Sequence, residues 1–284
     1  MRAKLTCLIP CKNEAANIEA CIESLRPIAD EILVADSGST DETMEIVRQI
    51  GRCKLIEREF INYADFKNWA IPQAAHEWVL IVDADERLTP ELAAEIRDVL
   101  ECPPQSVDGY WIYRRSFFLG HEIKHCGWDT DCVFRLIRRD HCRYGDCRVH
   151  EEIFVPQERA GALKAKLLHY TYWSYDQYFA KYLRYTKWGA LDMWDAGKRA
   201  SFSSLLLRPF LRFLQLYILK LGFLDGLAGI QVCMLQAFFV SFVKQGRLWE
   251  MEHARPQPMP PQPCKARSRP MNRPKPREPG AQST

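Results

Sequence analysis

The sequence predicts an α/β protein with a doubly wound sheet in its N-terminal half and a helical extension after it. Short apolar runs alternate with segments of helical periodicity through residues 4–82, and the runs end in polar or acidic turns. After Tyr175 only the helical period remains. Such alternation is typical of strands that are joined by helices within one sheet.

The first unit starts with an apolar strand over residues 4–10, followed by the polar loop Pro10-Cys11-Lys12-Asn13-Glu14. A helix is expected next, because apolar residues recur at helical spacing. These residues are Ile18, Cys21, Ile22 and Leu25.

The second unit has a strand over residues 31–35 and a turn rich in hydroxyls and acids over residues 36–41. The helix after this turn carries Met44, Ile46, Val47 and Ile50. A third strand is expected over residues 53–56, and a helix over residues 63–75 whose end is distorted by Pro72.

The most informative segment is the fourth strand and the acids that follow it. The unbroken apolar run over residues 78–82 suits a central strand that is covered on both faces. Asp83 and Asp85 come next, and their spacing of two puts both carboxylates on one side of the chain. At the edge of a sheet that faces the ligand crevice, such a pair favours a hard cation. The alternative is a solvated turn whose acids cap the helix after Pro90.

Four carboxylates are expected at the same edge of the sheet: Glu14, Asp36, Asp83 and Asp85. They would repel one another unless a cation or hydrogen-bond donors lay among them. A Mg²⁺ or Mn²⁺ ion that also binds a diphosphate would relieve this repulsion. The sequence therefore favours a binding site over a solvated rim.

Three motifs, each at the end of a predicted strand, carry a resemblance to a known family. Pro10-x-x-Asn13-Glu14, the turn over residues 36–41 and Asp83-Ala84-Asp85 occur in this order. Together they resemble the nucleotide-sugar-binding half of the family 2 glycosyltransferases, which have the Rossmann-like GT-A fold. Further segments resemble the bacterial lipopolysaccharide or lipooligosaccharide core β-1,4-glucosyltransferases: Lys67-Asn68, residues 135–139, Val149-His150-Glu151 and residues 169–172. The resemblance covers residues 4–250.

The resemblance implies roles in binding a nucleotide sugar. Asp36 would accept a hydrogen bond from the uracil base. Pro10, Asn13 and Glu14 would belong to the loop that cradles the nucleoside, and Asp83 would face the ribose or the phosphates.

The resemblance also implies a metal ion at the diphosphate. Asp85 would be the more direct ligand of Mg²⁺ or Mn²⁺, with Asp83 and His150 as further candidates. The ion would neutralise the charge that grows on the leaving UDP. Lys67 and Arg135 would complement the diphosphate, Arg135 through its two-pronged donor geometry.

An inverting transfer requires a carboxylate that removes the proton of the acceptor hydroxyl. Glu151 is the expected base, but Glu152 is adjacent to it and Asp131 lies upstream. The base therefore stays open among these three residues. His150 would either ligate the metal or orient Glu151.

The composition agrees with one catalytic domain and an appendage. The chain has 284 residues, 47% of them hydrophobic, and its net charge of +3 gives no reason to expect a nucleic-acid partner. The first residues lead directly into a strand, so no secretory signal is expected. The 11 cysteines have irregular spacing, which favours reduced thiols in the cytoplasm. No cysteine pair among residues 126–147 has the short Cys-x-x-Cys spacing that is typical of structural zinc sites.

The helical extension combines basic and apolar surface. A helix over residues 175–194 has a basic face with Lys181, Arg184 and Lys187. Apolar runs follow over residues 202–221 and 222–243, but cations interrupt the first, and Asp225, glycines and glutamines interrupt the second. Both are therefore poor membrane spans. The pattern suits helices in a membrane interface, or a hairpin packed on the catalytic domain or on another subunit.

The expected organisation is a GT-A catalytic domain over residues 1–173, a helical extension over 174–253 and a disordered Pro/Arg-rich tail over 254–284. The expected function is an inverting transfer of a hexose, glucose in the first place, from a UDP-sugar to the inner core of lipopolysaccharide. The enzyme would be cytoplasmic and peripheral on the inner membrane, where its lipid-linked saccharide acceptor lies. The alternatives are a polyprenyl-phosphate hexosyltransferase and a non-catalytic sugar-nucleotide-binding or scaffold protein.

Overall fold

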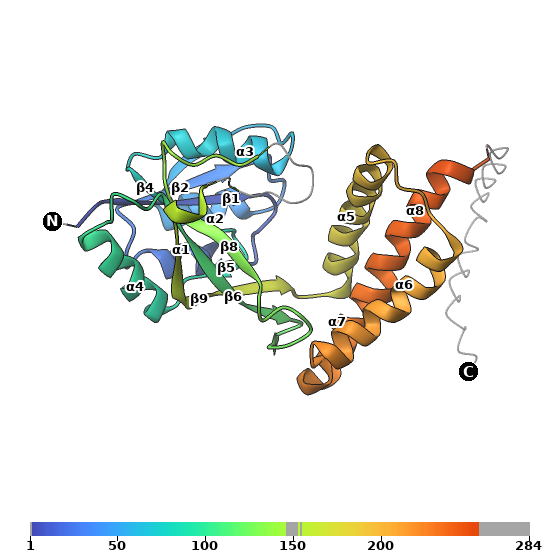
Figure 1. Cartoon of the computed structure of the whole chain (residues 1–284). Coiled ribbons are helices and arrows are strands. Elements are labelled where there is room, and N and C mark those ends of the chain that lie inside the picture. The colour runs from blue at the N-terminus through green and yellow to red at the C-terminus, as the bar shows by residue number, and fades with distance from the viewer. Residues whose placement is uncertain (1, 146–152, 154, 256–284) are drawn as a thin grey trace, which may run out of the picture.

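A computed structural model describes residues 2–145, 153 and 155–255 of the chain. A curved sheet with flanking helices forms the N-terminal part, and the helices of the C-terminal part form a bundle beside it (Figure 1). The α/β fold with a C-terminal helical extension is therefore confirmed. The tail is predicted from residue 254, and all of it after Arg255 lies outside the described residues.

The sheet is half parallel and half mixed. Within the described ranges its strands follow the order β3-β2-β1-β4-β8-β6-β9-β5, and β7 pairs with β6. The parallel half consists of β1 (Leu5–Cys11), β2 (Glu31–Asp36), β3 (Lys54–Glu57) and β4 (Trp78–Ile81). These are the four strands that the apolar runs predict, each displaced by one residue at most at its ends.

The remaining strands are β5 (Glu86–Arg87), β6 (Gly109–Phe118), β7 (His121–Ile123), β8 (Cys132–Arg138) and β9 (Ala160–Tyr172). Strand β8 is antiparallel to β4 and to β6, whereas β9 is parallel to β6. The two-residue strand β5 pairs with β9 and brings Glu86 opposite His169. This pairing places β9 next to the acidic turn after β4.

Helices cover both faces of the sheet. Apolar residues of α1 (Ile18–Leu25), α2 (Thr43–Ile50) and α4 (Pro90–Glu101) share one core cluster with alternate residues of β1 and β4. Residues of α3 (Tyr63–Ala70) share a second cluster with the intervening residues of the same two strands, such as Leu8 of β1 and Val79 of β4. As predicted, Pro72 lies where α3 ends, within the 3₁₀ turn Ile71–Gln73.

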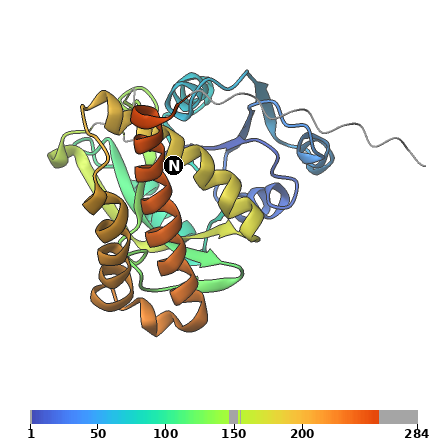
Figure 2. The ribbon, with the colours of Figure 1, turned by 90° about the vertical axis from the view of Figure 1, so that its right-hand side faces the viewer.

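The C-terminal bundle starts with α5 (Tyr175–Asp195), whose first turn is capped by Ser174. It continues with α6 (Phe202–Leu214), α7 (Gly226–Met234) and α8 (Phe242–His253). Short π-helical turns extend α6 and join α7 to α8. The long helices lie side by side in Figure 2.

Asp225 ties this bundle to the sheet. Its carboxylate is 4% exposed, accepts from the backbone N–H groups of Lys124 and His125, and lies 2.8 Å from Nδ1 of His125. Gln231 and Gln236 likewise bond to α5, through the hydroxyls of Tyr175 and Tyr182 at 2.6 Å. The polar residues that interrupt the second apolar run therefore face protein.

Two helical stretches, Phe202–Leu219 and Gly222–His253, are long and apolar enough by length and composition alone to cross a membrane. Core helices of soluble proteins can meet the same criteria. In these stretches, however, only 11% and 28% of the best window is buried. Many of their large apolar side chains are exposed, for example Phe202 at 81% and Leu227 at 83%.

Candidate active site

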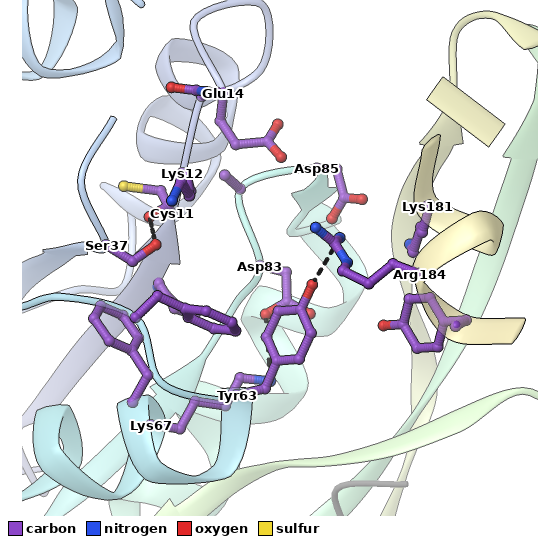
Figure 3. A pocket seen from close by; sticks show the side chains of 16 residues that line it. Cys11, Lys12, Glu14, Ser37, Tyr63, Lys67, Asp83, Asp85, Lys181 and Arg184 are labelled. Carbon is purple, nitrogen blue, oxygen red and sulfur yellow. Dashed lines mark hydrogen bonds and ion pairs between the residues drawn. The ribbon is translucent and has the colours of Figure 1, made fainter. Parts of the chain in front are cut away.

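A cavity of ≈ 440 Å³ opens at the carboxyl ends of β1 and β4, where α5 faces the sheet. Figure 3 shows the side chains that line it. Glu14, Asp83 and Asp85 come from the sheet side, and Lys181 and Arg184 come from α5. Three of the four predicted carboxylates thus meet at one rim, opposite two cations.

Asp83 is held by two cations. Its carboxylate pairs with Arg135 and lies 3.8 Å from Nζ of Lys67. Burial opposes ionisation of Asp83, but the neighbouring Arg135 and Lys67 outweigh it and hold its pKa well below the usual range. Asp83 is therefore ionised at any pH near neutrality.

Arg135 lies behind Asp83 and not in the cavity wall. Its side chain is 4% exposed and also reaches Oε1 of the fully buried Glu86 at 3.4 Å. Lys67, in contrast, is one of the residues that line the cavity. This geometry favours Arg135 as a residue that positions Asp83, whereas Lys67 can face a ligand.

Asp85 has a histidine beside it. Nε2 of His169 on β9 lies 3.5 Å from Oδ2 of Asp85. The other ring nitrogen, Nδ1, lies 3.3 Å from the hydroxyl of Ser116 and 3.0 Å from that of Thr171. Burial raises the pKa of Asp85, but His169 and Lys181 outweigh it, so the pKa lies below its ordinary value. Residues 169–172 carry part of the family resemblance, but no local pattern indicates that His169 reaches the acidic turn.

Glu14 differs from the two aspartates. Burial raises the pKa of its carboxyl from 4.5 to about 7, and the charges of Asp85 and Asp83 add to this, against a hydrogen bond from Asn17 and the charge of Lys181. Nδ2 of Asn17 donates to Glu14 at 2.9 Å. The cavity therefore contains one carboxyl group that can exchange a proton near neutral pH.

The loop after β1 is held by the turn after β2. Asn13 has a left-handed backbone with φ of 56°, and its side-chain oxygen accepts from the N–H of Thr40 at 2.7 Å. The hydroxyl of Ser39 accepts from the N–H of Asn13 at 2.9 Å. Pro10 and Asn13 both line the cavity, and their contact with a nucleoside stays a prediction.

Asp36 is at the same sheet edge, but it is outside the lining of this cavity. It pairs in register with Cys11 and is 3% exposed. Its carboxylate accepts from the N–H groups of Gly38 at 3.1 Å and Ser39 at 2.9 Å, and from the Ser39 hydroxyl at 2.6 Å. In this geometry Asp36 shapes the turn that presents Ser37 to the cavity, and its contact with a uracil base stays a prediction.

Of the three candidate bases, Asp131 lies within the described residues. Glu151, Glu152 and His150 lie outside the described residues. Asp131 is described, and both of its oxygens accept from the guanidinium of Arg114 at 2.8–2.9 Å. It lines a second cavity of ≈ 990 Å³, which shares Asp83 and Lys181 with the first. Asp131 therefore lies beside the site, already paired with a cation, and its role as the base stays a prediction.

The two cations of α5 are functional candidates that the sequence pattern did not assign to the site. The sequence predicts a basic face with Lys181, Arg184 and Lys187, and leaves open whether the helices meet a membrane interface or pack on the catalytic domain or another subunit. In the structure Lys181 and Arg184 line the cavity, and Arg184 donates to the hydroxyl of Tyr63 on α3 at 3.1 Å. Helix docking is a tertiary event, so no local signal predicts it.

The donors around Asp85 fit a divalent ion that binds together with its ligand. No group of three or more His, Cys, Asp or Glu side chains in the described part of the chain is arranged to hold a metal ion. Asp85 and His169, however, offer an oxygen and a nitrogen 3.5 Å apart. Mg²⁺ and Mn²⁺ commonly take one or two protein donors and complete their shell with water and phosphate oxygens. The pair therefore suits an ion that a diphosphate completes.

Comparison with known proteins identifies the family of the chain. The sequence profile of Glycosyl transferase family 2 matches residues 6–153. A lipopolysaccharide core biosynthesis glycosyltransferase, LpsC, of Rhizobium meliloti is 31% identical over 89% of this chain and 95% of its own length. An uncharacterized glycosyltransferase of Rickettsia felis is 29% identical, over 87% of this chain and 90% of its own length. The chain therefore belongs to glycosyl transferase family 2. It is a glycosyltransferase related to an enzyme of lipopolysaccharide core biosynthesis.

A solved structure is similar over part of the fold. Glucosyl-3-phosphoglycerate synthase from Mycobacterium tuberculosis, crystallised with Mn²⁺ and UDP, is 21% identical with a TM-score of 0.35. The similarity covers 40% of this chain and 44% of that one.

Proposed function

We propose that this glycosyltransferase moves a hexose, glucose in the first place, from a UDP-sugar to the inner core of lipopolysaccharide, with inversion and with the help of Mg²⁺ or Mn²⁺. The proposal depends on the cavity in which carboxylates from the sheet face Lys181 and Arg184. A nucleoside diphosphate with its bound cation carries both charges that such a lining would complement. The acceptor is suggested by the relative that is named for core biosynthesis.

Each side chain then has a task. Asp85 and His169 would hold the ion, which when bound would stabilise the charge of the departing UDP. Lys181 and Arg184 would bind phosphate oxygens from the opposite wall. Arg135 would keep Asp83 ionised and in place.

The acceptor hydroxyl needs a base, and Glu151 remains our proposal for it. The second cavity adjoins the first at Asp83, so an acceptor bound there would present its hydroxyl next to the donor sugar. Removal of the hydroxyl proton as the new bond forms would make the oxygen a better nucleophile.

We further propose that the enzyme is cytoplasmic and peripheral on the inner membrane. The polar residues of the last helices face α5 and the sheet, while apolar residues of α6 and α7 are exposed. Exposed apolar helix surface beside cations is typical of helices that lie in a membrane interface. A lipid-linked acceptor would then be within reach of the site.

Metal-dependent release of UDP is the test of the donor half. We expect purified enzyme with UDP-glucose and lipopolysaccharide inner core to release UDP, and Asp85→Ala to lower kcat/KM by about a hundredfold, as loss of an electrostatic stabiliser does. EDTA should abolish activity, and added Mg²⁺ or Mn²⁺ should restore it. Asp98→Ala, which removes an exposed aspartate from α4, is the matched control. Full turnover of Asp85→Ala in EDTA would refute the metal role.

The same assay separates the alternatives. UDP-glucose, UDP-galactose and their N-acetyl forms identify the donor. Polyprenyl phosphate in place of the core oligosaccharide tests the second candidate, which the two long apolar helices favour. Binding of UDP-sugar without transfer to either acceptor would leave a non-catalytic binding protein.

A further inference from the structure

The second cavity is a long channel along one face of α5. Residues of α5 in its wall recur at helical spacing, including Lys181, Tyr185, Gly189 and Asp192. At 1.5 Å per residue, the distance along the helix from Lys181 to Asp192 is about 16 Å. The channel is thus longer than a single hexose ring.

One end of this channel joins the first cavity, which is the proposed donor site. Asp83, Lys181 and Tyr185 line both cavities. His169 and Asp131 belong to the same end, and the indole of Trp128 adds an aromatic surface beside them. A saccharide that enters here would place one unit next to the donor sugar and its other units along α5.

The other end is lined by two lysines from different elements. Lys198 lies between α5 and α6, and Lys244 lies on α8. Gly189 makes room for Lys244, because a Cβ atom at position 189 would lie 3.0 Å from Cδ of Lys244. The lysine stem therefore crosses α5 where α5 has no side chain.

Positive charge is concentrated around Lys244. Burial lowers the pKa of its ammonium group, and the charges of Arg208, Arg212 and Lys198 lower it further. Gathered like charges are unfavourable unless an anion joins them. Asp192, about one helical turn after Gly189 on α5, also lines the channel. Asp131 lies at the opposite end and is paired with Arg114.

We propose that Lys198 and Lys244 form an anion subsite, which binds a phosphate or carboxylate group that the acceptor carries at a distance from its reacting hydroxyl. The inference rests on the proposed function for the identity of the acceptor. It adds that the acceptor is recognised by a negative charge at the far end of the channel. Charge-assisted hydrogen bonds to two lysines would fix the register of the saccharide.

The test uses small probes of known charge. Dissociation constants are measured by ligand-observed NMR for glucose 6-phosphate, glucuronate and glucose, with UDP and Mg²⁺ present to fill the first cavity. We expect at least one anionic probe to bind about tenfold more tightly than glucose, a difference that one or two charge-assisted hydrogen bonds account for. Preference for the phosphate or for the uronate identifies which group the acceptor carries.

Charge-removing variants locate the subsite. Lys244→Gln and Lys198→Gln should each reduce the preference to about threefold or less, with Lys244→Arg retaining it. Lys187→Gln removes the same charge from an exposed position of α5 that lines neither cavity, and should leave the preference unchanged. If Lys244→Gln does not fold, the exposed Lys198 carries the test.

Two results would overturn the subsite: equal affinity for all three probes, or an equal loss in Lys187→Gln and Lys198→Gln. The affinity for UDP, measured separately, shows whether the donor site exists. Failure of UDP to bind would refute the proposed function, while a charge preference that Lys244→Gln abolishes would still support the subsite.

Discussion

Three carboxyl groups in one cavity have different pKa values because their surroundings differ. Asp83 has Arg135 and Lys67 against it, and Asp85 has His169. Burial and the charges of Asp85 and Asp83 raise the pKa of Glu14 to about 7, and the hydrogen bond from Asn17 offsets only part of this rise. Sequence motifs identify such residues by type, but the protonation state depends on contacts between distant segments.

Glu14 makes stability depend on pH in a defined window. Its pKa is about 7 in the folded protein against 4.5 ordinarily, so between these values the folded state binds more protons than the unfolded state. The free energy of unfolding should therefore fall as pH rises from about 4.5 to 7, by at most about 3 kcal/mol for this one group. Glu14→Gln should remove this loss, so the variant should be the more stable protein at pH 8.

Urea unfolding of both proteins at pH 5 and pH 8 measures the effect. Glu19→Gln, at an exposed position of α1, is the control and should follow the wild type. If the difference between wild type and Glu14→Gln is the same at both pH values, Glu14 has an ordinary pKa.

At the scale of elements, periodicity predicts the parallel half of the sheet and misses the contacts that complete the site. Strands β1 to β4 have local apolar runs, and their carboxyl ends collect the acidic turns. The pairing of β5 with β9 joins residues more than eighty positions apart and is what brings His169 to Asp85. Strand β5 has two residues, too few for any periodic signal.

Helix α5 shows the same limit of prediction from periodicity. Its amphipathic pattern correctly predicts a helix with a basic face, but amphipathicity does not say what the face meets. Here Lys181 and Arg184 of this face meet the acidic rim of the sheet. The predicted boundary between the catalytic domain and the helical extension, at residue 173, therefore divides the residues of one cavity, because α5 contributes Lys181 and Arg184 to its lining.

Lys181→Ala tests the contribution of α5 to the donor site. The ammonium group lines both cavities and lowers the pKa of both Glu14 and Asp85, so its loss should weaken binding of an anionic nucleotide. We expect the dissociation constant for UDP in the presence of Mg²⁺ to rise about tenfold, as measured by calorimetry. Lys187→Ala on the same helix should bind as the wild type does, and equal affinity of Lys181→Ala would assign the diphosphate to other residues.

At the scale of the whole molecule, three polar residues of the bundle bond to protein, whereas many of its large apolar side chains are exposed. Asp225 bonds to the loop after β7, and Gln231 and Gln236 bond to α5. The sequence alone made these residues an argument against a membrane span, because their partners on α5 and in the loop after β7 were unknown. Because these residues bond to protein, the exposed surface of α6 and α7 is left with many large apolar side chains.

Large exposed apolar surfaces commonly mark contacts with a membrane or another protein. If the enzyme is peripheral, as proposed, the membrane covers this face. We expect the protein to float with vesicles that contain anionic lipid. The double variant Leu207→Asp/Leu211→Asp on α6 should remain at the bottom of the gradient, because both side chains are more than half exposed. Ile61→Asp, at an exposed apolar residue before α3, should float as the wild type does. Failure of the wild type to float, together with a dimer that the α6 variant dissociates, would instead assign the face to a second copy of the chain.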